Sequence, residues 1–118
     1  MFTVDGKKIT ISRGDTGDIL FTLTGHTFTS SDRAIFTVAN KNATTILMKE
    51  EYEITSGHFT VHFANNVTDQ WTAGNYKWEI RVVLNPTREE GVITDGDSII
   101  TPYADPGDFV VTSVLADI

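Results

Sequence analysis

The sequence predicts an all-β domain, an antiparallel β-sandwich of about eight to nine strands. Two observations predict this fold. Apolar and polar side chains alternate with a period of two in segments such as residues 76–82 and 58–63. Turn signals that contain glycine separate such segments at intervals of roughly 8–12 residues, as in sandwiches and barrels. Since no strand alternates with a long amphipathic helix, we expect neighbouring strands to run antiparallel.

The clearest alternation lies in residues 76–82. Four large apolar side chains share one side of this segment, and Lys77, Glu79 and Arg81 share the other. Residues 58–63 likewise place three apolar side chains opposite two histidines and a threonine. Because successive side chains of a strand point to opposite faces, both segments predict a sheet with one buried and one solvated face.

The other strands follow from shorter patterns and from the turns between them. Asp5-Gly6 predicts a hairpin near the N-terminus, because Gly tolerates positive φ. A further apolar hairpin is expected after the segment that ends near residue 40. In chain order, the predicted strands lie near residues 2–4, 8–12, 18–24, 33–40, 44–49, 51–55, 58–63, 75–84 and 108–114, with two shorter ones near 91–94 and 98–101.

Helical structure is expected in one place only, as at most one short turn near residues 66–71. Asn66 or Thr68 is the predicted N-cap, and Trp71 is predicted to pack back onto the sheet. Residues 85–108 hold all three prolines and several acids. We expect this region to form a long hairpin or a pair of exposed loops.

Composition narrows the classes of function. The 118 residues, with a mass of 13.0 kDa, fit a single domain spanning residues 1–118. There is no Cys, which excludes disulfides, thiolate zinc sites and a Cys nucleophile. The formal net charge is −7 and the nine basic residues are scattered, so nucleic acid and anionic membranes are not expected partners. The N-terminal segment lacks the pattern of a signal peptide, and no apolar run approaches the roughly 20 residues of a membrane span.

Acidic residues gather late in the chain and suggest a surface calcium site. Calcium prefers several oxygen ligands on a flexible loop. The spacing departs from the EF-hand pattern, however, and solvated acids in turns explain the same residues. The calcium candidates are Asp95, Asp97, Asp105 and Asp108, with Glu89 and Glu90 nearby.

Aromatic residues suggest a second kind of site, a platform on which a sugar stacks. Tyr52 and Tyr103 are the candidates for it, because exposed aromatics on loops form such sites. Trp71 and Trp78 are instead expected in the core, since large aromatics dominate sandwich cores.

No catalytic motif is recognised, so no catalytic residue, cofactor or enzyme activity is expected. His58 and His62 share one face of a predicted strand but lie roughly 13 Å apart, too far for one metal ion. Arg13-Gly14-Asp15 spells an adhesive tripeptide, and a Gly-Asp turn between two strands explains the same three residues.

Four features in fixed order resemble a known family. Residues 11–16 lead into an apolar strand, and residues 34–38 form a second strand. Residues 72–82 contain the pattern Gly-x-Tyr-x-x-x-Ile, and residues 107–111 close the chain with a last strand. This order is similar to that of the immunoglobulin-like N-terminal domain of phage baseplate upper proteins and related phage tail structural proteins.

The resemblance implies an immunoglobulin-like sandwich without enzyme activity or cofactor. It implies a structural part of a virion, made in the host cytoplasm, that contacts other phage tail or baseplate proteins. Such domains usually act as oligomers, so a homo-oligomer is among the assemblies that the resemblance implies. Such contacts need exposed strand edges or apolar patches, for which Leu20, Ile35 and Val92 are candidates if they face outward. The alternative is a carbohydrate-binding sandwich used in recognition of the host surface.

Overall fold

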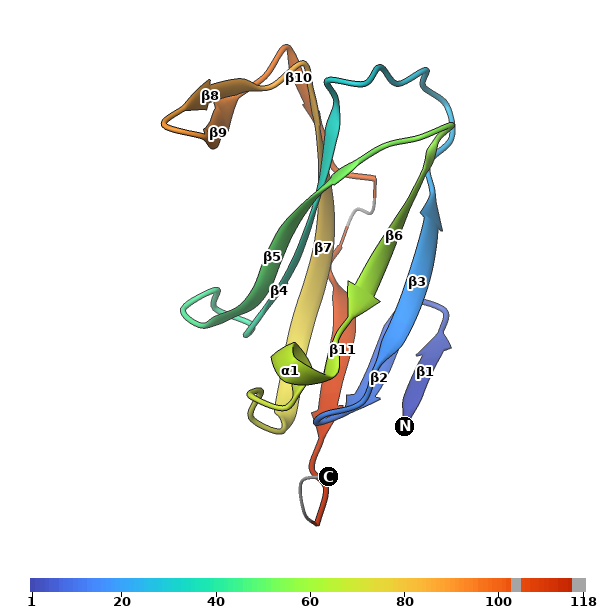
Figure 1. The fold of residues 1–118 in the computed structure, drawn as a ribbon, viewed down its shortest axis with the longest axis vertical. Coiled ribbons are helices and arrows are strands. Elements are labelled where there is room, and N and C mark those ends of the chain that lie inside the picture. The colour runs from blue at the N-terminus through green and yellow to red at the C-terminus, as the bar shows by residue number, and fades with distance from the viewer. Residues whose placement is uncertain (103–104, 116–118) are drawn as a thin grey trace.

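The computed structural model describes residues 1–102 and 105–115 (Figure 1). These residues form eleven strands and one short helix, in keeping with the predicted all-β class. No helix among them is long and apolar enough to cross a membrane. The elements are β1 (Phe2–Asp5), β2 (Lys8–Ser12), β3 (Gly17–Thr22), β4 (Arg33–Ala39), β5 (Ile46–Glu53), β6 (His58–Phe63), α1 (Asn65–Thr68), β7 (Gly74–Leu84), β8 (Thr87–Glu89), β9 (Val92–Asp95), β10 (Ser98–Ile100) and β11 (Gly107–Thr112).

Two sheets face each other to form a sandwich (Figure 1). The large sheet has the strand order β1-β2-β11-β7-β4-β5, and β10 pairs with the far end of β7. The small sheet consists of β3 and β6 alone. A third pair, β8 and β9, forms a separate hairpin that projects from the body of the molecule.

The expectation of wholly antiparallel sheets is wrong for one pair. β2 and β11 run parallel, with Phe109 opposite Ile9, whereas the other neighbours are antiparallel. The reason is connectivity: nearly the whole chain separates these two strands, so no tight turn fixes their relative direction. The predicted hairpin at Asp5-Gly6 is confirmed, since β1 pairs with β2 around it.

The prediction of two separate strands near 44–49 and 51–55 is also wrong. The structure has one continuous strand, β5, which pairs with β4 from Ala39 to Arg33. The residues at its middle are Lys49, Glu50 and Glu51, none of which favours a turn as Gly, Pro, Asn or Asp does. The chain therefore has no local reason to reverse there.

The predicted helical turn exists as α1, but its N-cap is different from the predicted one. Ala64 occupies the N-cap position and no side chain caps the helix. Thr68 is instead the last helical residue, fully buried, and its hydroxyl donates to the carbonyl of Asp15 at 2.8 Å. Trp71 packs inward as predicted, with only 5% of its surface exposed.

The core between the sheets is dominated by aromatic rings. Phe36 of β4 stacks on Trp78 of β7, with ring centroids 5.8 Å apart. Phe63 of β6 contacts both Phe36 and Phe109, so the rings join the two sheets. The predicted inward faces are confirmed, because these side chains are buried while the residues between them are not.

Candidate interaction surface

A groove of about 480 Å³ lies on the outer face of the large sheet, away from the aromatic core. β4 and β7 form its floor, with Ile35, Thr37 and Arg81 pointing outward. Ile46 and Lys49 of β5 form one side. The opposite side is formed by residues of β9 and β10. The alternation of β4 and β7, which buries one face, therefore leaves the other face exposed, and the groove lies on that face.

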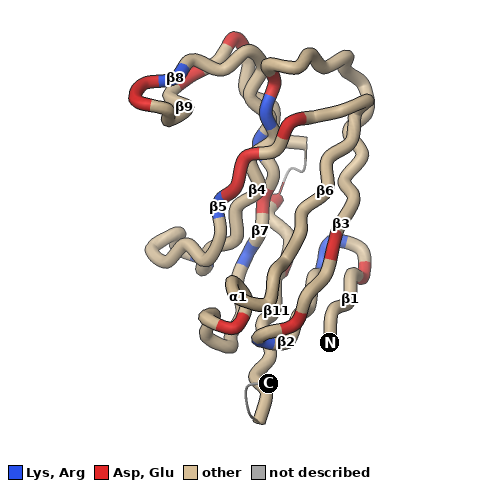
Figure 2. Tube along the Cα trace, in the orientation of Figure 1, with Lys and Arg blue, Asp and Glu red and all other residues tan. Residues whose placement is uncertain are grey.

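The β8–β9 hairpin, here called the arm, stands beside this groove and projects from the body (Figure 1). Its strands are joined by Glu90 and Gly91, whose φ angles are +53° and +81°. Positive φ at both central residues defines the type I′ turn that fits the twist of a two-residue hairpin. Glu89 and Glu90 lie at its tip, one of several places where Figure 2 shows acidic residues.

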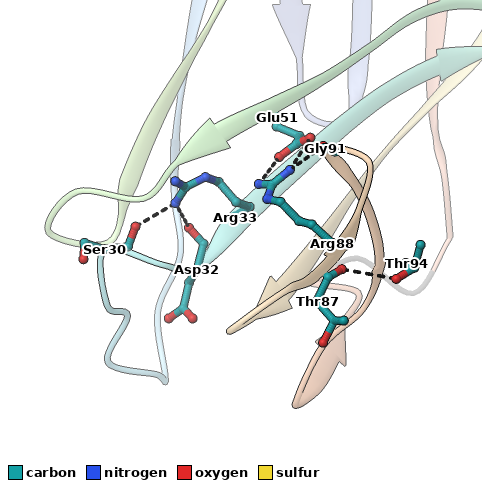
Figure 3. Close-up of polar contacts among 8 residues, drawn as sticks. All are labelled: Ser30, Asp32, Arg33, Glu51, Thr87, Arg88, Gly91 and Thr94. Atoms are coloured by element: carbon teal, nitrogen blue, oxygen red, sulfur yellow. Dashed lines mark hydrogen bonds and ion pairs between the residues drawn. The ribbon is translucent and has the colours of Figure 1, made fainter.

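Arg88 fixes the arm against the edge strand β5 (Figure 3). Its guanidinium donates two hydrogen bonds to the carboxylate of Glu51, at 2.7 and 3.3 Å, and a third to the carbonyl of Gly91 at 3.1 Å. The hydrogen bond from Arg88 lowers the pKa of Glu51, although burial alone would raise it. Bidentate pairing of this kind adds geometric specificity, so it sets the direction in which the arm points.

The base of the arm is held by Asp32, which is only 4% exposed. Its two carboxylate oxygens accept hydrogen bonds from the backbone N–H groups of Thr29 and Asn85, both at 2.8 Å. Burial raises the pKa of Asp32, and these backbone donors outweigh that effect, so the pKa lies below its usual value. Asp32 thus ties the loop before β4 to Asn85, which lies between β7 and the arm.

A second contact at the base requires a glycine. A Cβ on Gly96 would lie 2.5 Å from Cγ1 of Val83 and 2.9 Å from the carbonyl oxygen of Leu84. Val83 is buried, although it faces the outer side of the large sheet and lies outside the main core cluster. Close approach of the returning chain covers Val83 and places β10 beside the end of β7.

The calcium candidates are not gathered into a site. Asp95, the last residue of β9, accepts a hydrogen bond from the backbone N–H of Gly96, and Asp97, just before β10, accepts one from the side chain of Asn85. Asp108 pairs with Lys77, and the backbone carbonyl of Asp105 accepts a hydrogen bond from Lys7. In residues 1–102 and 105–115, no group of three acidic or imidazole side chains is close enough to hold a metal ion.

The structure does not place Tyr52, one of the two candidates for a sugar-stacking platform, on an exposed loop. Tyr52 lies within β5 and stacks on Phe59 at a centroid distance of 5.6 Å. Burial raises the pKa of its hydroxyl, with a smaller contribution from Glu50. Tyr103 lies outside the described residues. Every Phe, Tyr and Trp side chain that the structure describes is buried or half-buried, Trp71 and Trp78 among them.

The two histidines and the Arg13-Gly14-Asp15 tripeptide, also considered from the sequence, contact other residues of the chain itself. His58 and His62 share the outer face of the small sheet, where they meet Thr22 and Asp18 respectively. Arg13 donates to the backbone carbonyl of Asp69 at 3.0 Å. The turn at residues 13–15 is therefore held against α1 and its following turn.

The proposed apolar patch is spread over three parts of the molecule. Ile35 lines the groove, Leu20 lies on the small sheet, and Val92 lies on the arm. Leu20 and Val92 are each 63% exposed. Lys77, Glu79 and Arg81 lie on the outer side of β7, as the alternation of that strand predicts. The predicted strands near 91–94 and 98–101 are present as β9 and β10. Strand β8 was not predicted, nor was the contribution of Ile46, which depends on how distant segments are placed.

The protein is an all-β sandwich with a groove on the outer face of its large sheet and the arm beside that groove. No protein-family model matches the chain, and no curated protein or solved structure matches it either.

Proposed function

We propose that this chain is a structural module of a phage or prophage virion, part of the tail or baseplate, that assembles through protein–protein contacts. It is made in the host cytoplasm and acts in the virion. The proposed role involves no catalysis and no cofactor. Its partners are other tail or baseplate proteins, with further copies of the chain among the possible neighbours.

The observation that carries this proposal is the groove on the outer face of the large sheet. A solitary antiparallel sandwich turns a polar face to water. Here isoleucines stand among charged side chains on that face, with Ile35 half-buried and Ile46 55% exposed. Apolar side chains within a polar rim are the usual anatomy of a protein–protein interface.

The immunoglobulin-like character implied by the family resemblance has its own support. The hydroxyl of Tyr76, near the start of β7, donates to the carbonyl of Thr72 at 2.6 Å. A tyrosine that bonds back to the backbone at the corner between two sheets is a hallmark of that fold. α1 lies in the same corner, between β6 and β7. The carbohydrate-binding alternative has no comparable support, since Tyr52 is packed against Phe59.

The test is whether the chain is a component of particles. Virions released from the source cells after prophage induction would be purified and analysed by mass spectrometry, before and after amine cross-linking. We expect the chain in stoichiometric amounts, with cross-links from Lys41 and Lys49 to a neighbouring virion protein. The free protein, cross-linked alone, is the control for background reactivity. A chain absent from purified particles would refute the proposal.

A further inference from the structure

The groove concentrates positive charge on an acidic protein. Its lining includes four basic side chains against two acidic ones, while the chain as a whole carries −7. Lys77 is already paired with Asp108. Lys41, Lys49 and Arg81 make no hydrogen bond or ion pair with any residue in the described part of the chain. The groove therefore presents three cations without a hydrogen bond or ion pair in the described part of the chain, close to the apolar side chain of Ile35.

The tip of the arm carries the complementary chemistry. Glu89 and Glu90 are exposed and, within the described ranges, neither carboxylate takes part in a hydrogen bond or ion pair. Val92 pairs with Glu89 across the hairpin and is 63% exposed. The tip thus offers two carboxylates and one apolar side chain on a hairpin that Arg88 holds in a fixed direction.

The arm does not satisfy the groove of its own copy. Its inner residues, Ile93, Thr94 and Asp95, form part of the groove lining, whereas Glu89, Glu90 and Val92 do not. Since the base of the arm is fixed through Asp32 and Gly96, the tip is held away from the cations. The cations of the groove and the carboxylates of the arm tip therefore lie on neighbouring parts of one molecule without pairing with each other. The arm tip of a second molecule can pair with the cations of the groove.

We propose that the groove binds the arm tip of a second copy of this chain. Glu89 and Glu90 of one copy then meet Lys49 and Arg81 of the other, and Val92 contacts the floor at Ile35. This inference rests on the proposed assembly role and names one of its partners. The arm and the groove lie side by side on each copy. Two copies related by a two-fold axis can therefore each place their arm in the groove of the other, which closes the assembly as a dimer.

Charge complementarity makes the proposal testable by exchange of charges. The arm variant E89K/E90K carries lysines at the tip, and the groove variant K49E/R81E carries glutamates in the groove. Sedimentation velocity over a range of concentrations would measure self-association of each protein. We expect the wild-type chain to form a dimer in the micromolar range, and each variant alone to bind itself at least about tenfold more weakly. An equimolar mixture of the two variants should recover the dimer, because both contacts are again between opposite charges.

The controls separate specific pairing from net charge. D5K/D18K makes the same change in net charge as the arm variant, on strands β1 and β3, far from the arm in sequence. It should dimerise like the wild type and should not rescue the groove variant. Dimerisation of the wild type should also weaken as salt is raised. Thermal unfolding of each variant establishes that it is folded.

Two results would overturn the inference: a wild-type chain that stays monomeric into the millimolar range, or folded variants whose mixture does not associate. Either result leaves the virion role standing, since that role is judged by the presence of the chain in particles. Conversely, if the mixed variants recover the dimer while purified particles lack the chain, that pair of results would support this inference and refute the virion role.

Discussion

The two faces of the large sheet use the same strands for different purposes. On the inner face, Phe36, Trp78 and Phe109 are almost entirely buried and contact rings of the small sheet. On the outer face, Ile35 and Arg81 stand directly beside one another in a groove. The inner face stabilises the fold by burial. The outer face retains side chains whose charge and apolar surface are not used internally, and these are available to a partner.

The largest expected effect comes from breaking the inner face at Phe36, which is 0% exposed. Phe36→Ala should reduce the free energy of unfolding by about 3–5 kcal/mol, because it leaves a cavity among three aromatic rings. Ile35→Ala, one residue away on the outer face, is the matched variant and should cost only about 1 kcal/mol. Chemical denaturation measures both. Equal losses at the two positions would contradict the division between the faces.

Asp32 connects the body to the arm, and its removal should have the next largest effect. Asp32→Asn should reduce stability by about 3 kcal/mol at neutral pH, because the amide can accept only one of the two backbone hydrogen bonds. The exposed Asp5→Asn is the control. Denaturation curves compare the two variants with the wild type.

The same carboxylate predicts a pH dependence. The pKa of Asp32 is lower in the folded than in the unfolded protein. Its contribution is therefore complete above the unfolded-state pKa of about 3.9, and it is lost as the pH falls through the lower, folded-state value. Stability measured between neutral and strongly acidic pH should converge for the wild type and Asp32→Asn at the acidic end. A constant difference at all pH values would show that ionisation of Asp32 does not matter.

A smaller effect is expected at Gly96, where the arm returns to the sheet. Gly96→Ala should cost about 1–2 kcal/mol, because the new Cβ would meet Val83 and the carbonyl of Leu84 and force the chain outward. In Gly74→Ala the nearest atom, in the Tyr76 ring, would be 3.6 Å away, an ordinary contact. Gly74→Ala is therefore the control, and it should be tolerated better. The reverse order would show that the arm base is not closely packed.

The smallest effect on global stability is expected for Arg88→Ala, which leaves the core untouched. Loss of the pair with Glu51 should speed amide hydrogen exchange in β8 and β9, while the midpoint of global unfolding stays unchanged. Lys49→Ala, on the neighbouring strand, should change neither quantity. Unaltered exchange in the arm of Arg88→Ala would mean that other contacts fix its direction.

The sequence predicted those features that depend on local pattern. Alternation in β4, β6 and β7 correctly identified the buried and exposed faces, and Asp5-Gly6 correctly located a hairpin. Two kinds of feature were beyond it. Parallel pairing of β2 with β11 is non-local, so no short pattern records it. The arm turns at Glu90-Gly91, which lacks the Asn or Asp that usually marks a type I′ turn.

The candidate surface could be predicted only in part, for a related reason. Arg81 was correctly placed on the solvated side of its strand. That Lys49 and Ile35 stand near it follows from pairing across β5, β4 and β7, which sequence spacing does not specify. Late acids such as Asp95 and Asp108 are close in sequence, yet separate strands place them beside different partners.

The parallel pair also governs how the chain must fold. β11, the last strand of the described chain, lies between β2 and β7 in the large sheet. Before β11 is in place, the N-terminal hairpin of β1 and β2 has no backbone partner strand in the rest of that sheet. During synthesis the edge of the first hairpin therefore stays unpaired until β11 (Gly107–Thr112) has been made. Contacts of such long sequence separation predict slow folding. Until β11 is in place, the unpaired edge of β2 can pair with a strand of another chain, so we expect aggregation to begin there.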